Sequence, residues 1–566
     1  MRTIKILLAG LIFLMLNASG QSTSDDDKSG VVIVISGGGK VSYEKGVKIS
    51  EEPEFVDTVT VLFDLDYTSI DQKLESNFEV EPIKPPKLVI MEPLDKITKN
   101  YFALGLNDFK TAPFAEYTHT TIRNKEYNGG FHFKHFSSDM RVPNAARAKF
   151  TETHGAIHGK KILERQILST HLDYDYNTFR NYGFDPVIYQ PINKEDILLH
   201  MSVFKGDFAL TSTKHKFNKY DYDARVNYAQ LYAHNEIAEH IVGVEGEIGG
   251  KYFPNGGIMD SLPTKDLTGN WQVQFKADYL NSQDSIKSNS STLFKLRPNY
   301  KVNYKSLNVT LALPIFFNTN NVRLLTALPT LNFDWAVVKD ILILYGGYDR
   351  DYYRNYYLTY MSQNPFIGAD LPYLNTHVKF DFQAGLRGAF TSKTTFNFGV
   401  KYQNIGNFVL FVNDANILGN RQFTVLTDEV NKQQLFAELV YENRKIKSGV
   451  LAEYNRYQLA TYDAYHLPAV FAQAYAKYNV QDKFKIGLDL FYYGEQLALD
   501  VENVPDPTAT KLLKPIFDFN FNVDYKYNET FGAFFKLNNI LSTRHQRWNQ
   551  YPNYGINVLG GVYLSW

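Results

Sequence analysis

The chain has 566 residues, with 59 Lys and Arg against 60 Asp and Glu, 40 Tyr, 41 Phe, 4 Trp and no Cys. The absence of Cys excludes disulfide scaffolds and thiolate metal or redox sites, and the near-zero net charge argues against a nucleic-acid-binding protein. Aromatic residues make up 15% of the chain although the mean hydropathy is only -0.30, a combination typical of a sheet that is apolar on one face and wet on the other.

The first twenty residues predict a secretory signal peptide. Two basic residues in Met1–Lys5 precede the apolar stretch ILLAGLIFLML, and small residues follow at Ala18 and Gly20, so cleavage is expected before Gln21. No later stretch approaches the roughly 20 apolar residues that a membrane helix needs. An exported chain of this kind is periplasmic, secreted or an outer-membrane barrel.

Residues 21–98 differ in composition from the rest and predict a short periplasmic extension. They contain the polar segment SDDDKSG (24–30), a short strand candidate VVIVIS (31–36) and the stiff Pro-rich linker PIKPPKL (82–88). The segment SGGGK (36–40) is not a phosphate-binding loop, because Val34 and Val41 stand where that motif requires Gly and Ser or Thr. A glycine turn explains it.

From residue 99 to 566 the sequence repeats a period of two, which predicts β-strands with one apolar and one polar face. In WQVQFKADY (271–279) the apolar and aromatic residues alternate with Gln, Lys and Asp, and FDFNFNVDYKY (517–527) behaves in the same way. These strands have about ten residues, the length of a tilted membrane strand, whereas sandwich strands have about five or six. We therefore predict an all-β fold, a transmembrane antiparallel up-and-down β-barrel in the outer membrane of a Gram-negative bacterium, in contact with its lipid.

The connections between the expected strands alternate between short and long from about residue 300. Outer-membrane barrels have short periplasmic turns and long outer loops, so both chain termini are expected in the periplasm. The one exception is the long connection 253–269, which falls where a short turn is due. Either the count is wrong by one strand or the protein has an unusual periplasmic loop there. We count about 22 strands, within bounds of 16 to 22. The expected starts lie near residues 100, 114, 127, 148, 165, 200, 220, 240, 269, 291, 306, 326, 340, 375, 395, 431, 446, 468, 483, 515, 531 and 554.

Charged residues on the polar faces are the candidates for a functional lining of the lumen. They either tune what passes, as in selectivity filters, or pair across strands and solvate the lumen; their mixed signs favour pairing. The candidates are Arg225, Glu245, Glu247, Lys276, Asp278, Lys379, Asp381, Arg387, Lys401, Asp518 and Asp524.

Catalytic, cofactor and metal sites are not expected. His154 and His158 lie about 13 Å apart along one strand, too far for a single ion, and His132 and His135 fall on opposite faces. No nucleophile motif of an outer-membrane enzyme is visible, so we do not expect an enzyme.

The C-terminal segment FFKLNNILSTRHQRWNQYPNYGINVLGGVYLSW (534–566) resembles the closing strands of TonB-dependent receptor barrels. Asn539-Ile540-Leu541, Trp548, Tyr551-Pro552 and Gly555 match that pattern, whereas Ile556 stands where the family usually has Arg, and Trp566 where it usually has Phe. The resemblance also implies a barrel of 22 strands. Such receptors carry a plug of more than a hundred residues before the barrel, and the extension 21–98 is too short for one.

The last strand would serve as an insertion signal for the barrel assembly machinery, which recognises an alternating strand that ends in an aromatic residue. Its apolar residues would face lipid, with the aromatic end at the periplasmic interface. These residues are Ile556, Val558, Val562, Leu564 and Trp566.

The function expected from the sequence is solute passage across the outer membrane, through a lumen that loops, the extension or a partner must obstruct. The alternative is a structural subunit of an outer-membrane transport or assembly complex, in which PIKPPKL (82–88) tethers a periplasmic or outer-membrane protein partner.

Overall fold

The computed structural model describes residues 98–108, 112–121, 124–189, 197–213, 220–252, 267–319, 325–416, 421–500 and 509–566. All of them belong to one compact unit, Glu92–Trp566. The expected signal peptide, the Pro-rich linker and the question of a missing plug concern residues before Thr98, which lie outside these ranges.

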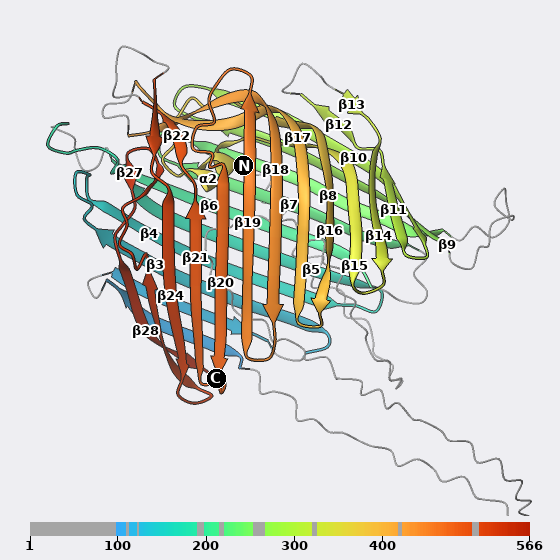
Figure 1. Ribbon diagram of the computed structural model, residues 1–566, viewed down its shortest axis with the longest axis horizontal. Helices are drawn as coiled ribbons and strands as arrows, with labels where there is room; N and C mark the ends of the chain where they lie inside the picture. The colour runs from blue at the N-terminus through green and yellow to red at the C-terminus, as the bar shows by residue number, and fades with distance from the viewer. Residues whose placement is uncertain are drawn as a thin grey trace, which may run out of the picture. The chain divides into compact units, whose positions relative to one another are not determined.

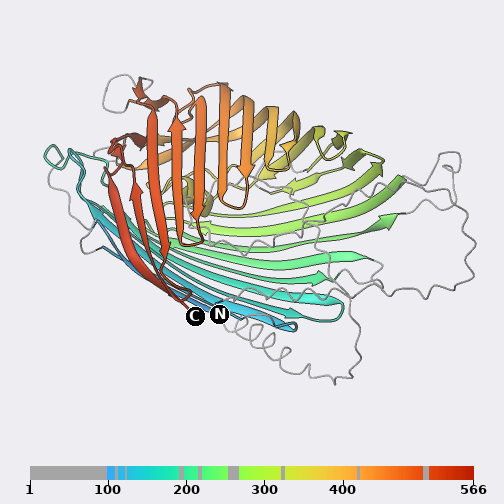
Figure 2. The same ribbon diagram turned by 60° about the horizontal axis from the view of Figure 1, so that its bottom comes forward.

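A single antiparallel sheet closes on itself to form a barrel (Figure 1; Figure 2). Its first half comprises β1 (Asn100–Asn107), β2 (Ala112–Thr120), β3 (Tyr127–Met140), β4 (Ala148–Ile162), β5 (Gln166–Arg180), β6 (Leu198–Ser212), β7 (Asp221–Ala233), β8 (Ala238–Tyr252), β9 (Leu267–Gln283), β10 (Ser288–Tyr304), β11 (Leu307–Ala312) and β12 (Ile315–Asn318). Its second half comprises β13 (Leu325–Ala327), β14 (Thr330–Val338), β15 (Leu342–Tyr353), β16 (Thr376–Thr391), β17 (Thr394–Asn413), β18 (Phe423–Glu442), β19 (Ile446–Leu459), β20 (Val470–Val480), β21 (Phe484–Tyr493), β24 (Ile516–Lys526), β25 (Phe531–Asn538) and β28 (Asn557–Ser565).

These 24 segments form 22 barrel strands, because two strands are each interrupted once. On one side, β11 and β12 both pair with β10. On the other side, β11 pairs with β14 and β12 pairs with β13. Pro314 and Pro329 stand at the two breaks, which lie opposite each other, and a proline cannot donate a ladder hydrogen bond. The predicted barrel of about 22 strands is confirmed.

The observed strand starts lie within three residues of the expected ones, except for β18. That strand begins at Phe423 rather than near residue 431, and with β17 it forms a ribbon of two 20-residue strands. At about 3.3 Å per residue such a strand is roughly 66 Å long, more than a tilted crossing of the hydrocarbon needs. The alternation of apolar and polar residues in β18 therefore continues beyond the membrane, into residues 423–430, which the sequence predicts to be part of a loop.

Large apolar side chains cover the outer face of the barrel. Val226, Val244 and Phe275 belong to adjoining strands and are 51%, 42% and 36% exposed. Such exposure is costly in water but favourable against lipid. Within the described ranges, no helix is long and apolar enough to span a membrane.

The two ends of the barrel differ in the length of their connections. We call the end with residues 305–306, 339–341, 392–393 and 443–445 the turn end, and the opposite end, with 354–375 and 539–556, the loop end. Connection 253–266 joins β8 to β9 at the turn end, so its length reflects an unusual connection and not a miscounted strand.

The barrel closes where β1 pairs with β28. Tyr101 lies opposite Ser565 and Asn107 opposite Leu559, and the register is unbroken between them. At the turn end, the backbone carbonyl of Trp566 accepts hydrogen bonds from the N–H groups of Lys99 and Asn100, each at 2.8 Å. The first and last described residues therefore lie side by side.

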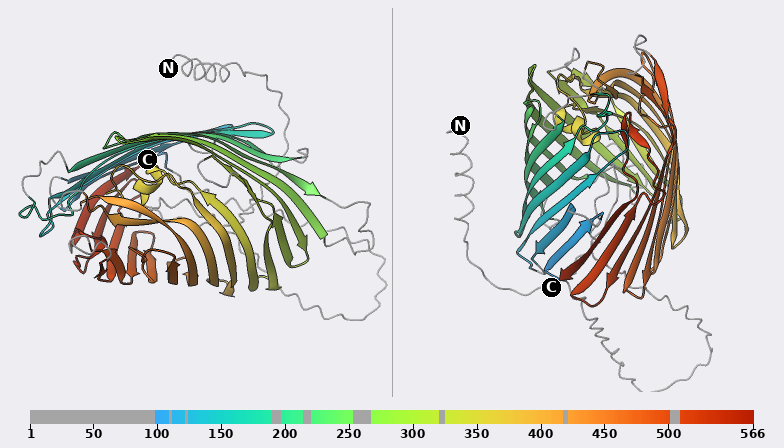
Figure 3. Two further views of the ribbon diagram at one scale, coloured as in Figure 1. Left: turned by 90° about the horizontal axis from the view of Figure 1, so that it is seen from above. Right: turned by 90° about the vertical axis from the view of Figure 1, so that its left-hand side faces the viewer.

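Connections at the loop end fold together around a buried apolar cluster, which we call the loop core. It surrounds the short helix α2 (Tyr357–Gln363), which lies within the ring of strands in Figure 3. The buried members of the loop core are Val142, Ala146, Ala148, Tyr182, Phe184, Ile197, Val203, Leu231, Ala233, Ile237, Tyr357, Tyr360, Met361, Ile367, Leu371, Phe411, Phe423, Val425 and Tyr551. Two small hairpins at the same end, β22 (Gln496–Leu499) with β23 (Thr510–Leu513) and β26 (Gln546–Trp548) with β27 (Tyr551–Pro552), complete the described elements.

Candidate functional site

The lumen is lined by the polar faces of the strands. Lys295 on β10 contacts Asp351 on β15, although β10 and β15 are separated in the sheet by two strands. Such a contact can only pass through the inside of the barrel. Register then places the charged residues of the neighbouring strands on the same inner face, because side chains alternate with a period of two.

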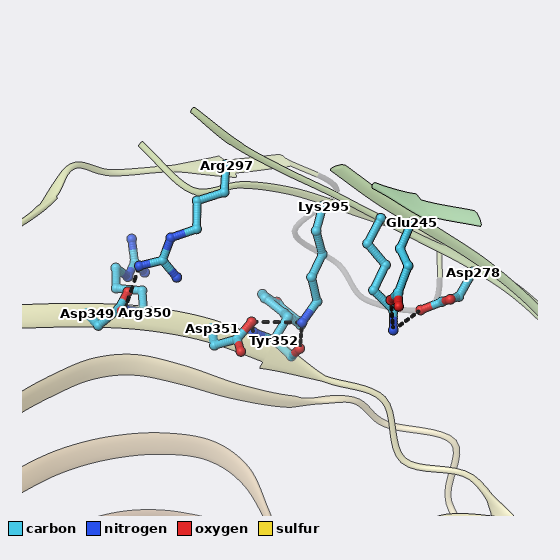
Figure 4. Close-up of polar contacts among 9 residues, drawn as sticks. Glu245, Asp278, Lys295, Arg297, Asp349, Arg350, Asp351 and Tyr352 are labelled. Carbon is cyan, nitrogen blue, oxygen red and sulfur yellow. Dashed lines mark hydrogen bonds and ion pairs between the residues drawn. The ribbon is translucent and has the colours of Figure 1, made fainter. Parts of the chain in front are cut away.

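Three groups of ion pairs lie between and along these walls (Figure 4). The Nζ atom of Lys276 lies 3.2 Å from Glu245 and 3.8 Å from Asp278. Lys295 Nζ donates to Asp351 Oδ1 at 2.7 Å and also to the carbonyl of Tyr352. These contacts tie the wall formed by β8, β9 and β10 to β15.

Arginines extend the same belt of charges. Arg297 Nη2 donates to Asp349 at 2.7 Å, and Arg350 Nε donates to the carbonyl of Lys379 at 2.8 Å. Arg354, which follows β15, donates to Ser291 Oγ at 2.8 Å and to the carbonyl of Asp278 at 2.9 Å. Cations and carboxylates here neutralise one another, so this part of the lumen presents a wet surface of mixed charge and not a filter of one sign.

Eight of the eleven charged residues expected on the lumen face take part in ion pairs, with partners on the same strand, on the adjacent strand or on the next strand but one. Besides the Lys276 group, Arg225 lies 3.8 Å from Glu245, Lys401 lies 3.2 Å from Asp381, Lys379 lies 2.6 Å from Glu429 and Arg387 lies 2.7 Å from Asp334. The other three are placed differently. Glu247 accepts hydrogen bonds from Gln272 and Gln274, Asp524 lies opposite Lys485, and Asp518 lies opposite Phe491.

A band of histidines on β3, β4 and β5 pairs with carboxylates of the same or a neighbouring strand. His154 Nδ1 lies 2.7 Å from Asp175, and His171 Nε2 lies 2.9 Å from Asp173. His132 lies 3.3 Å from Glu116, a residue of β2. In the described part of the chain, no three His, Asp or Glu side chains converge on a point where one metal ion could be held.

The connection 354–375 is anchored to the barrel wall by Glu239 of β8. The carboxylate of Glu239, only 1% exposed, accepts hydrogen bonds from the N–H groups of Tyr357 at 2.8 Å and Leu358 at 2.9 Å. Ser282 Oγ donates a third, at 2.8 Å. These two N–H groups open α2 and have no partner within the helix, so Glu239 satisfies them where water cannot.

A second carboxylate, Asp284 in the connection between β9 and β10, holds the far part of the same segment. It accepts hydrogen bonds from the hydroxyl of Tyr357 at 2.5 Å and from the N–H of Asp370 at 3.2 Å. Burial acts to raise the pKa of Asp284, but these hydrogen bonds outweigh it and hold that pKa below its ordinary value. The two acids therefore act as polar anchors at the edge of an apolar cluster.

Sequence reasoning missed these anchors and the contacts across the lumen. Alternation gives the face of Lys295 and Arg297, but it cannot say which distant strand lies opposite. The register shift between Asp349 and Asp351 also breaks the simple period in that strand. Glu239 stands at the start of its strand, where an acid is normally taken for a solvent-exposed end.

The expected insertion signal lies on β28 with its apolar residues outward. Leu564 is 40% exposed and faces Phe102 and Phe531 of the neighbouring strands, and Val562 is 45% exposed. Ile556 and Trp566 are also exposed, and Val558 is half-buried. This placement suits contact with lipid, while the role in insertion stays a prediction.

Deleting Trp566 should reduce the amount of folded barrel in the membrane. Three backbone hydrogen bonds to Lys99 and Asn100 would be lost, each contributing about 1 kcal/mol, together with the aromatic end of the strand. Membrane levels and heat-modifiable migration on a detergent gel measure the effect, and Trp566→Phe serves as the control that keeps both features. Normal levels of the truncated protein would show that assembly does not depend on this residue.

Neither a family model nor a curated protein matches this sequence. Solved structures do match. The siderophore receptor PirA from Acinetobacter baumannii superposes with a TM-score of 0.60 at 11% identity, covering 82% of this chain and 80% of that one. The FrpB iron transporter from Neisseria meningitidis gives 0.59 at 10% identity, with 84% and 82% covered.

The pyoverdine outer membrane receptor FpvA from Pseudomonas aeruginosa PAO1 gives a TM-score of 0.59 at 9% identity, covering 83% of this chain and 78% of that one. At these identities the likeness shows the fold, which is that of outer-membrane receptor and transporter barrels. The expected TonB-receptor-like barrel is thus confirmed as a fold. These neighbours are receptors and transporters, in line with the expectation that the chain is not an enzyme.

Proposed function

We propose that the protein is an outer-membrane barrel that passes a solute through its lumen and keeps that lumen closed at the loop end by the loop core. The turn end, with Asn100 and Trp566, faces the periplasm, and the loop end faces the outside. The outward apolar band, the alternation of short and long connections, and the likeness to outer-membrane receptors and transporters support this orientation and location. Outer-membrane lipid and the assembly machinery are the partners that follow.

The observation that carries the proposal is the combination of a polar, charged lumen with an apolar cluster across one end. A barrel of 22 strands is wide enough to need an obstruction, which in barrels of this size is a plug. Here Tyr357, Tyr360 and Ile367 of one connection are each at most 1% exposed, against partners drawn from four other connections and from the ends of the strands. A loop buried to that degree is a structural closure of the barrel mouth.

Planar-bilayer conductance of the purified protein tests the proposal. The full chain should give little conductance, and a variant in which residues 357–371 are replaced by a Gly-Ser segment of equal length should give large steps. A matched control replaces the exposed Ser362 and Gln363 of the same helix with Ala, which leaves the loop core intact. A third variant lacks residues 21–98.

Each outcome distinguishes a different arrangement. Large conductance after removal of 357–371 supports closure by the loop core, and conductance only after removal of 21–98 assigns the obstruction to the extension. The absence of conductance in every variant, including one that combines the replacement of 357–371 with the removal of 21–98, would overturn solute passage. It would favour the alternative, a scaffold subunit whose Pro-rich linker holds a partner.

A further inference from the structure

Arg547 is a lumen cation that has no carboxylate partner among the described residues. It lies in β26, and its guanidinium sits 5.1 Å from the ring centre of Tyr493 and 5.6 Å from that of Trp548. Its hydrogen bond within the described chain runs from Nη1 to the amide oxygen of Gln496, at 3.1 Å. Lys276, Lys295 and Arg297, by contrast, each have a carboxylate partner.

The guanidinium of Arg547 faces the lumen. Tyr493 is on the inner face of β21, since its register partners Phe471 and Ile516 are buried whereas the alternate residue Tyr492 lies opposite the exposed Phe517. Arg547 is itself accessible to solvent, yet the surrounding protein desolvates it enough to lower its pKa. Solvent access together with a lowered pKa is what we expect for a cation that borders an enclosed, water-filled space.

A second donor without a partner lies beside this cation. The amide nitrogen of Gln496 has no hydrogen-bond partner in the part of the chain that the structure describes, although the residue is only 1% exposed. Because that nitrogen shares one amide group with the oxygen that contacts Arg547, it lies next to the guanidinium. A buried donor left unpaired costs about 1–3 kcal/mol. A ligand that accepts a hydrogen bond from this donor therefore gains more binding free energy than a ligand that accepts one from a solvated donor at the surface.

Lys432 on β18 adds a further positive charge to the same region. Its ammonium lies 5.6 Å from the ring centre of Tyr457, its register partner on β19. Glu453 of the same strand β19 accepts a hydrogen bond from Gln434 at 3.0 Å. The described carboxylates near Arg547 and Lys432 include Glu453 and Asp518. The aromatic rings of Tyr457, Tyr493 and Trp548 surround the region.

We propose that Arg547 and Gln496 form an oxyanion-binding subsite beside the loop core, against which Trp548 packs, for a carboxylate or phosphoryl group of a solute that enters the lumen. The guanidinium offers a planar fork of donors that matches two oxygens of such a group, and the flanking rings would contact an apolar or aromatic body attached to it. This inference rests on the proposed function and specifies the chemical class of what the lumen accepts.

Titration calorimetry of the full-length protein in detergent, in a phosphate-free buffer, tests the subsite with two probes, inorganic phosphate and benzoate. Saturable binding of one or both is expected. Arg547→Gln should weaken it by at least about tenfold, the usual effect of losing a charged hydrogen-bond partner, and Arg547→Lys, which keeps the charge but not the fork, by less.

The matched control is Arg297→Gln, which removes a lumen arginine that already has a carboxylate partner and should leave the affinity unchanged. Stronger binding of benzoate than of phosphate would assign a carboxylate with an attached ring, and the reverse a phosphoryl group. No saturable binding by the wild-type protein, or equal affinity in the wild type and Arg547→Gln, would overturn the subsite. Neither result depends on conductance, so a failure of the subsite can be distinguished from a failure of the proposed solute passage.

Discussion

Replacing Glu239 with Ala should release the connection 354–375 from the barrel wall. The change leaves the N–H groups of Tyr357 and Leu358 buried without an acceptor, and it removes one of the two partners of the Ser282 hydroxyl. A buried donor without a partner costs about 1–3 kcal/mol, so the closed arrangement should lose roughly 3 kcal/mol or more. Amide hydrogen exchange over residues 354–375 should then become about a hundredfold faster, since each 1.4 kcal/mol corresponds to a factor of ten.

Asp370→Asn is the matched control for this prediction, because Asp370 has a φ of 61° and Asn tolerates that left-handed conformation. Asp370 belongs to the same connection and pairs with Lys287 at 2.8 Å, but its side chain is 58% exposed. An exposed ion pair contributes at most about 1 kcal/mol, so this variant should exchange nearly as slowly as the wild type. If Glu239→Ala left exchange unchanged, or if both variants changed it equally, α2 would have to be held by apolar packing alone.

Acidification should loosen the loop core through His466. This residue lies in the connection 460–469 and is only 2% exposed. Its Nδ1 donates to the carbonyl of Phe411 at 2.9 Å and its Nε2 accepts from the N–H of Asn549 at 3.1 Å, an arrangement that requires the neutral ring. Burial, with a smaller contribution from the positive charge of Arg547, lowers the pKa of His466 to about 4.

The direction of the pH effect follows from that lowered pKa. An opened loop has a His466 with an ordinary pKa near 6.5, so between pH 6.5 and about 4 the open form binds more protons than the closed form. The closed form therefore loses stability as the pH falls through this window, by about 3 kcal/mol in total, and is unaffected above it. His234, whose Nε2 donates to the carbonyl of Ile367, has a pKa lowered by burial and acts in the same direction.

Trp548 gives this prediction a local signal, because its ring centre lies 5.2 Å from that of His466. In a protein whose other three tryptophans are replaced by Phe, Trp548 fluorescence should change as the pH falls from 6.5 to 4. His466→Gln should weaken that change, whereas His200→Gln, at an exposed position of β6, should leave it intact. A titration curve identical in the wild type and His466→Gln would exclude His466 as the group responsible.

Much of the barrel was predictable from sequence because lipid and water impose opposite demands on the two faces of each strand. The alternation of Phe517, Phe519 and Phe521 with Asp518 and Asn520 gives both the strand and its faces. The spacing of such segments then gives the number of strands. The prolines at 314 and 329 escaped notice because a break in two adjoining strands preserves the outward alternation on either side of it.

The loop core could not be predicted, since its members have no common period and come from distant parts of the chain. Tyr182, Phe366 and Tyr551 contact one another through their rings but are separated by hundreds of residues. Ion pairs across the lumen could not be predicted either. Register relates a residue only to its neighbouring strands, and it is the curvature of the closed sheet that brings β15 close to β10. Pairing between neighbouring strands, such as Lys276 with Glu245, is the part that sequence could anticipate.

The seam between β1 and β28 also determines the order in which the molecule can fold. Tyr101 and Ser565 are paired although 464 residues separate them, a contact of very high sequence separation that cannot form early. Until β28 has been translocated and paired, β1 and β25 present open edges, and the loop core lacks Tyr551. Closure of the wall and closure of the mouth therefore depend on the same C-terminal segment, so a barrel that is still assembling stays open on its side and at its end together.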